Sequence, residues 1–176
     1  MKLTRILAMT ALPFIALATG AQSQTAAPNA LAETYDNWSV RCVTPQGEGK
    51  SQSCQMTLEL RQGNTGQRVL LLGFAPDTAD RNKFDATLIA PLGIDLAKGV
   101  TVAAADKQLV QSQFTTCVPE GCVTRFAADR DLLKTLRSSE KLTVSMQASG
   151  TGQEIRLEAP LKGFSAAMDR LLVLVK

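Results

Sequence analysis

The chain has 176 residues, of which 45% are hydrophobic and 20% are charged. This composition is typical of a globular protein of about one domain, and it excludes the disordered and fibrous classes. There are 19 Lys and Arg residues against 16 Asp and Glu residues, and there is no His. Without imidazole, the sequence excludes Ser-His-Asp and Cys-His nucleophile pairs, His-ligated zinc or haem, and a histidine general base.

The first residues predict a secretory signal peptide. Lys2 and Arg5 precede an apolar stretch at residues 6–18, which is shorter than the roughly 20 apolar residues that a membrane-spanning helix needs. Small residues follow, so we expect cleavage near Ala21, with residues 1–21 as the leader. The exported chain would then be periplasmic, or secreted or held at the cell surface, without a transmembrane anchor.

Loss of the leader changes the charge of the chain. Residues 1–21 hold two basic residues and no acidic one, so 17 basic and 16 acidic residues remain, a net charge of +1. The basic residues are scattered, and one Trp and one Tyr offer little for base stacking, so we expect no nucleic-acid partner. Residues 22–32 have few large hydrophobic side chains and predict a disordered linker, and the folded domain is expected at residues 33–176.

From Tyr35 onward the dominant pattern is an alternation of apolar and polar residues, which is typical of half-buried strands. Trp38, Val40 and Cys42 share one face of the first predicted strand. Further strands are predicted at residues 54–61, 69–75, 84–90, 100–104, 109–116, 123–127, 142–146 and 155–159.

Two helices are predicted among these strands. Residues 129–137 begin with acidic residues and end with Arg137, which complements the helix dipole. Residues 166–174 form the second helix, with Ser165 as its N-cap. Eight or nine short strands favour an antiparallel β-sandwich or barrel-like domain whose open edge or end is closed by the two helices.

The four cysteines, Cys42, Cys54, Cys117 and Cys122, predict two disulfides, because an even number in an exported chain favours a closed set. Three connectivities are possible. Pro119 and the glycine two residues later suit a tight turn between Cys117 and Cys122, which leaves Cys42 to pair with Cys54. Metal binding and redox catalysis are the weaker alternatives, because neither pair has C-x-x-C spacing and eleven residues separate Cys42 from Cys54.

Short motifs run through nearly the whole exported chain. They are Glu33-Thr34-Tyr35, Trp38-Ser39-Val40-Arg41-Cys42, Cys54-Gln55-Met56, Pro91-Leu92-Gly93-Ile94, Lys98-Gly99-Val100, Cys117-Val118-Pro119-Glu120-Gly121-Cys122 and Leu161-Lys162-Gly163-Phe164. In this order they resemble the invasion-associated locus B family of exported bacterial proteins, over residues 33–176. The resemblance implies a periplasmic or surface-associated protein, linked in some members to host-cell entry and virulence. It implies no known enzymatic activity.

Paired carboxylates are the remaining acid-base candidates. Asp77 with Asp80 and Asp129 with Asp131 are close in sequence, but the first pair falls in a polar loop and the second at a helix start, where acids complement the dipole. We therefore interpret both pairs as structural. We expect no catalytic residue, no metal site and no cofactor.

Two apolar loops framed by Gly and Pro are the candidate partner-contact sites, since contacts concentrate in loops on a rigid scaffold. The candidate residues are Leu92, Ile94 and Leu96 in one loop and Val118, Pro119 and Glu120 in the other. Burial of the first three over the core is the competing interpretation.

Trp38 has two interpretations, packing in the core against the adjacent disulfide or stacking on a ligand. The C-terminal helix carries apolar residues at 171–175 over more than one stripe, so it either docks deeply or offers an interface for a homo-oligomer. Together these features predict a non-enzymatic exported protein that binds another protein or an envelope component. The alternative is a periplasmic carrier that holds a lipid or small ligand between its sheets.

Overall fold

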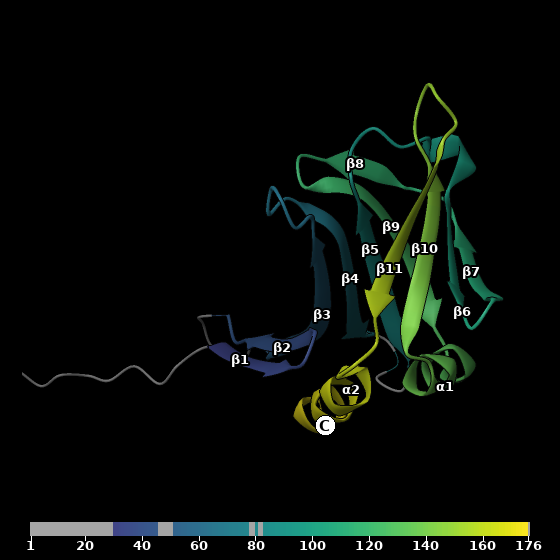
Figure 1. Ribbon diagram of the computed structural model, residues 1–176. Helices are drawn as coiled ribbons and strands as arrows, with labels where there is room; N and C mark the ends of the chain where they lie inside the picture. The colour runs from purple at the N-terminus through teal and green to yellow at the C-terminus, as the bar shows by residue number, and fades with distance from the viewer. Residues whose placement is uncertain (1–29, 46–50, 78–79, 81–82, 176) are drawn as a thin grey trace, which may run out of the picture.

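The computed structural model describes residues 30–45, 51–77, 80 and 83–175. These residues form two antiparallel sheets and two α-helices, which confirms the predicted mainly β fold (Figure 1). The predicted signal peptide and residues 22–29 of the predicted linker lie outside the described residues.

The larger sheet has seven strands in the order β1-β2-β3-β4-β5-β9-β8. All neighbours in this sheet are antiparallel, and the first five strands follow the order of the chain. The strands are β1 (Ala30–Tyr35), β2 (Trp38–Val43), β3 (Ser53–Arg61), β4 (Arg68–Pro76), β5 (Phe84–Ala90), β8 (Thr116–Val118) and β9 (Gly121–Ala128).

The smaller sheet has four strands in the order β11-β10-β6-β7. They are β6 (Val100–Ala104), β7 (Lys107–Ser112), β10 (Lys141–Gln147) and β11 (Glu154–Pro160), and a short 3-10 helix, η1 (Leu96–Lys98), precedes β6. The chain enters this sheet after β5, returns to the larger sheet for β8 and β9, and then re-enters it for β10 and β11.

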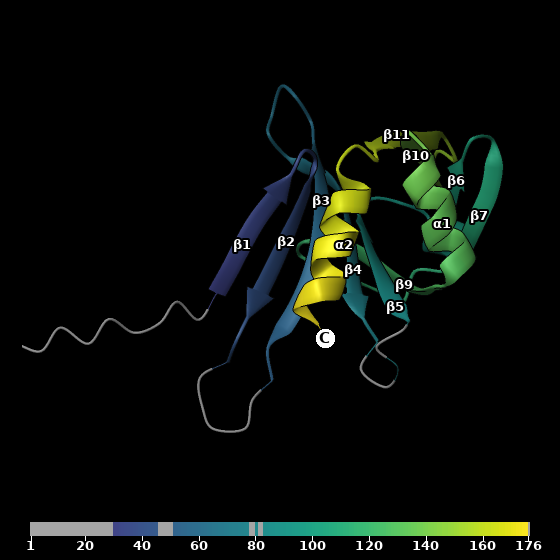
Figure 2. The ribbon, with the colours of Figure 1, turned by 90° about the horizontal axis from the view of Figure 1, so that it is seen from below.

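The C-terminal helix lies on the part of the larger sheet that the smaller sheet does not cover. Helix α2 (Phe164–Leu174) contacts β1, β2 and β3, while α1 (Arg130–Ser138) lies beside α2. Figure 2 shows α2 running lengthwise against the larger sheet beside β3, with the smaller sheet beyond β5 and β9. The apolar face of β1 to β3 is therefore sealed by a helix rather than by a second sheet.

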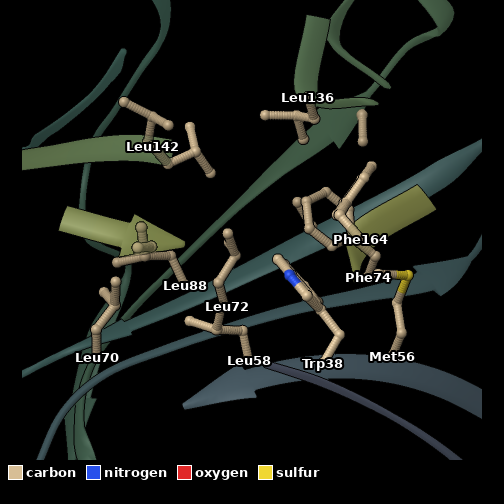
Figure 3. Packing of buried hydrophobic residues seen from close by; sticks show 14 of the residues in the cluster. Trp38, Met56, Leu58, Leu70, Leu72, Phe74, Leu88, Leu136, Leu142 and Phe164 are labelled. Carbon is tan, nitrogen blue, oxygen red and sulfur yellow. The ribbon is translucent and has the colours of Figure 1, made fainter. Parts of the chain in front are cut away.

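Three aromatic rings join the helix to the larger sheet. Trp38 of β2, Phe74 of β4 and Phe164 of α2 are all almost completely buried. The Trp38 and Phe164 ring centroids lie 5.0 Å apart in an edge arrangement, and Phe74 lies 5.5 Å from Phe164 (Figure 3). Edge arrangements of this kind contribute about 0.5–1.5 kcal/mol beyond burial. Trp38 is thus a core residue.

The start of α2 differs from the prediction. Its N-cap is Gly163 rather than Ser165, and Gly163 has a φ of 91° and no side-chain capping bond. A Cβ at Gly163 would lie 2.0 Å from the Tyr35 carbonyl oxygen. Close approach of the helix start to the β1–β2 turn requires glycine, and Ser165 falls inside the helix.

Two strand predictions also need correction. The strand predicted at residues 109–116 is divided, because β7 ends at Ser112 in the smaller sheet and β8 starts at Thr116 in the larger one. The chain crosses between the sheets where the buried Thr124 hydroxyl donates to the Gln113 carbonyl oxygen at 2.8 Å. Strand β1 begins at Ala30, so the last three residues of the predicted linker pair with β2.

Candidate functional site

The apolar residues of the loop after β5 have two interpretations, as partner contacts or as part of the core, and the structure shows that the residues differ. Ile94 is only 5% exposed and forms an isolated antiparallel bridge with Ala148. Leu92 and Leu96, in contrast, are 59% and 41% exposed. Ile94 therefore anchors the loop to the core, and the side chains on either side of it are left at the surface.

Main-chain hydrogen bonds hold this loop against the end of β10. The Asp95 amide donates to the Gln147 carbonyl oxygen and the Ser149 amide to the Gly93 carbonyl oxygen, each at 2.8 Å. The Asp95 carboxylate accepts from the Ala97 amide at 3.0 Å and caps η1. Leu92 and Leu96 consequently project from a fixed backbone.

The second predicted loop is the tip of the β8–β9 hairpin. Val118 is 39% exposed, and Pro119 and Glu120 are exposed with it. Gly121 has a φ of 138°, and a Cβ there would lie 2.2 Å from the Ala90 carbonyl oxygen. The hairpin tip therefore lies directly against the end of β5, two residues before Leu92.

The structure thus brings the two predicted loops to one end of the larger sheet, which we call the loop end and define by Leu92, Leu96, Val118, Pro119 and Glu120. Figure 1 shows the β8–β9 hairpin and the loop that follows β5 on the side of the molecule opposite α1 and α2. The loop end presents exposed apolar side chains on a rigid frame, which is suited to contact with another protein.

Arg68 also supports the loop end, a role that the sequence did not predict. Its Nη2 donates to the Glu120 carbonyl oxygen at 2.9 Å, and its Nη1 lies 3.8 Å from the Glu59 carboxylate. Arg68 and Glu120 are 52 residues apart. Because the acceptor is a main-chain carbonyl, no pairing of residue types in the sequence could have revealed this contact.

Both predicted disulfides are present. Cys42 is bonded to Cys54 and Cys117 to Cys122, with Cα separations of 4.0 and 3.9 Å. Each bridge joins residues directly opposite each other on neighbouring strands. The first bridge is buried, whereas Cys117 of the second is exposed at the base of the hairpin tip.

An ion-pair network lies at the other side of the sheet, between β1 and α2. Arg170 donates from Nε and Nη2 to both oxygens of Glu33, at 2.8 and 2.9 Å, and the Tyr35 hydroxyl donates to the same carboxylate at 2.9 Å. The Arg170 hydrogen bonds and then the Tyr35 bond lower the pKa of Glu33, while the bond to Glu33 raises the pKa of Tyr35. Bidentate pairing fixes the orientation of both partners, so this network ties β1 to α2.

Two of the carboxylates considered for catalysis, Asp77 and Asp129, form structural hydrogen bonds. The Asp129 side chain accepts from the Leu132 amide at 2.8 Å as the N-cap of α1, and Asp77 accepts from the Asp80 amide at 3.0 Å. Asp80, Asp129 and Asp131 line a surface pocket of about 680 Å³. This pocket lies by the start of α1 and away from the loop end.

No group of three or more Cys, Asp or Glu side chains with metal-binding geometry occurs among the described residues. The helices in the described part of the chain are all too short or too polar to cross a membrane.

Comparison with known proteins gives consistent results. Residues 38–172 match the family model described as Invasion associated locus B (IalB) protein. An Invasion protein B homolog of Brucella abortus is 33% identical over 170 residues, covering 97% of this chain and 95% of the relative. Invasion protein B of Bartonella bacilliformis is 31% identical over 151 residues, covering 84% of this chain and 78% of the relative. The crystal structure of invasion associated protein B from Bartonella henselae aligns with a TM-score of 0.73 and 26% identity, covering 82% of this chain and 97% of that one.

Proposed function

Because the chain belongs to the invasion associated locus B family, we propose that it acts as an exported, non-enzymatic interaction protein of the bacterial envelope. Two disulfides support a location outside the cytoplasm, since disulfides persist in oxidising compartments. The names of its relatives refer to invasion, and we extend that role to this chain as a contribution to host-cell entry.

The observation that carries the proposal is the exposure of Leu92 and Val118 at one end of a rigid sheet. Exposed apolar side chains become favourable contacts when a partner removes them from water, at about 25 cal/mol per Å². Ile94 and the Cys117–Cys122 bridge hold the two loops in place, so little further ordering is required on binding. The partner that fits is a protein with an apolar, weakly charged surface.

A photo-crosslinking amino acid at Leu92 tests this in the living bacterium. We expect it to capture a defined envelope or host-cell protein, which mass spectrometry would identify. Val43 is the matched control, because it is an apolar residue of similar exposure, 52%, on β2. The same crosslinker at Val43 is expected to capture little.

The double substitution Leu92→Ser and Val118→Ser is the functional counterpart. It is expected to reduce entry into cultured host cells, while Val43→Ser leaves entry unchanged. Entry equal to that of the wild type in the double variant, at the same level of exported protein, would contradict the proposal. Because all three positions are exposed, circular dichroism should show the same fold for each variant.

The carrier alternative receives less support from the same structure. The second surface hollow, of about 640 Å³, is open to solvent and mixes the charged residues Asp77, Asp85 and Arg125 with apolar ones such as Leu174 and Val175. Lipid-binding cavities are predominantly apolar and enclose most of their ligand. Native mass spectrometry of protein purified from its own periplasm would show a bound lipid if this alternative were correct.

A further inference from the structure

The larger sheet ends at β1, and this edge lacks the features that protect the other sheet edges in the described chain. Natural sheets block their edges with charges, proline, bulges or very short strands. Strand β8 has three residues, and its disulfide ties it to β9. Strand β11 carries three alternating charges and ends in Pro160, and β7 is bulged against β6. Strand β1 has six residues with no proline and no bulge, and its one charged residue, Glu33, is paired with Arg170.

The register of the β1–β2 hairpin shows which main-chain groups point outward. Tyr35 pairs with Trp38 across a two-residue turn, and the closing pair of such a turn is hydrogen-bonded. Since hydrogen-bonded pairs alternate along an antiparallel ladder, the N–H and C=O groups of Ala30, Ala32 and Thr34 point away from β2.

The first disulfide gives an independent check of this assignment. By the same alternation, the main-chain groups of Cys42 form hydrogen bonds with β1. Cys42 and Cys54 of β3 are therefore a non-hydrogen-bonded pair. The Cα of Cys42 lies 4.0 Å from that of Cys54, close to the roughly 4.5 Å of such pairs and well below the roughly 5.5 Å of hydrogen-bonded ones.

The side chains of β1 allow close approach along this edge. Ala30, Ala32 and Thr34 are small and exposed on the face away from α2. Glu33 is the one ionisable group of β1 apart from Tyr35, and Arg170 of the same chain neutralises it. Two such edges can therefore meet without unpaired like charges, which would otherwise oppose association.

Helix α2 extends the apolar character of the edge. Val173 is 57% exposed and lies about one turn beyond Arg170, whose side chain reaches Glu33 of β1. Figure 2 shows α2 beside β3, with the outer edge of β1 left uncovered by any other labelled element.

We propose that this edge binds a second copy of the chain, with β1 paired antiparallel to β1 of the copy about a two-fold axis near Ala32. Each copy then supplies three N–H and three C=O groups in matching positions, and the larger sheets join into one. A second copy fits better than an unrelated strand, because length, spacing and charge are matched by symmetry. This inference does not depend on the loop end or on the proposed function.

Ala32→Pro is the decisive substitution. Proline removes the outward N–H of residue 32 and leaves the ladder between β1 and β2 intact, since proline is tolerated at edge positions whose N–H faces solvent. Ala32→Val is the matched control, because it keeps the N–H and favours a strand. The experiment uses the exported chain, purified after processing in a bacterial host, in sedimentation velocity and light scattering between about 1 and 200 μM.

We expect the wild type and Ala32→Val to reach twice the monomer mass as concentration rises. The dimer of Ala32→Pro should be roughly thirtyfold weaker, because one hydrogen bond is lost in each copy. The amides of Ala32 and Thr34 should exchange slowly only at dimer concentrations. A wild-type protein that stays monomeric throughout, or an unchanged dimer in Ala32→Pro with the same circular dichroism spectrum, would overturn the proposal.

Discussion

Replacing Cys42 and Cys54 together with Ala is expected to destabilise the domain more than replacing Cys117 and Cys122 together. The two bridges are alike in that each joins opposed residues of neighbouring strands. They differ in two measurable ways. The first closes 12 residues of chain and the second only five, and the first is buried at both ends while Cys117 is exposed.

The loop lengths set the first part of the magnitude. In the chain-entropy model, closing 12 residues stabilises the fold by about 3 kcal/mol and closing five residues by about 2 kcal/mol. Each buried sulfur that is removed adds roughly 1 kcal/mol for lost packing. Cys42, Cys54 and Cys122 are buried, so the totals are about 5 kcal/mol for the first pair and about 3 kcal/mol for the second.

Urea unfolding of the non-reduced variants measures this difference. Trp38 is the chain's single tryptophan and is fully buried in the aromatic cluster, so its fluorescence reports unfolding directly. A gap of about 2 kcal/mol corresponds to roughly 4–8 °C in melting temperature for a domain of this size. Equal destabilisation, or a greater loss for the Cys117 and Cys122 pair, would refute the reasoning from loop length and burial.

The remaining predictions concern the junction of β1 with α2 and one hairpin turn. Gly163→Ala should lose more than about 2 kcal/mol of unfolding free energy, because its Cβ would meet the Tyr35 carbonyl oxygen in a left-handed conformation; an unchanged urea midpoint would contradict this. Ala105 has a φ of 46° between β6 and β7, so Ala105→Gly should stabilise the fold by roughly 1 kcal/mol, and a lower melting temperature would count against it. Arg170 lowers the pKa of Glu33 below its ordinary value of about 4.5 in the folded state. The stabilisation from Glu33 is therefore complete above that value and is lost as pH falls through the lowered pKa. The stability difference between the wild type and Glu33→Gln should accordingly shrink between neutral pH and about pH 3, and a difference independent of pH would exclude a role for the charge.

Local patterns in the sequence predicted much of the fold. Strands β3, β10 and β11 alternate apolar and polar residues because one face of each is buried. The Cys117–Cys122 bridge follows from a turn of four residues, and α1 begins at an aspartate that caps it. In each case the determining interaction lies within a few residues of chain, so the sequence displays it.

The features that the sequence did not predict depend on distant partners. Strand β1 starts in a run of small residues, and its Glu33 pairs with Arg170, 137 residues away. The break at residues 113–115 follows from a hydrogen bond between Thr124 and Gln113 that forms only when the sheets meet. Near the loop end, the sequence could not separate buried Ile94 from exposed Leu92, because the bridge that holds Ile94 is made with Ala148, a residue distant in sequence that follows β10.

The motifs that define the family resemblance are mostly explained by the fold itself. Lys162 forms an ion pair with Asp36 at 2.9 Å, and Gly163 lies against the Tyr35 carbonyl, so two motifs far apart in the chain meet at the α2 junction. Gly121 likewise allows the end of β5 to pack against the hairpin, because a Cβ at this position would clash with the Ala90 carbonyl oxygen.

Leu92 and Val118 belong to the same motifs but are exposed, and their burial contributes little to stability. The fold depends on the glycines and the buried side chains of these motifs, but it does not depend on Leu92 or Val118. Their presence in water at one end of the molecule is therefore the part of the motif set that folding leaves unexplained, and a binding partner would account for it.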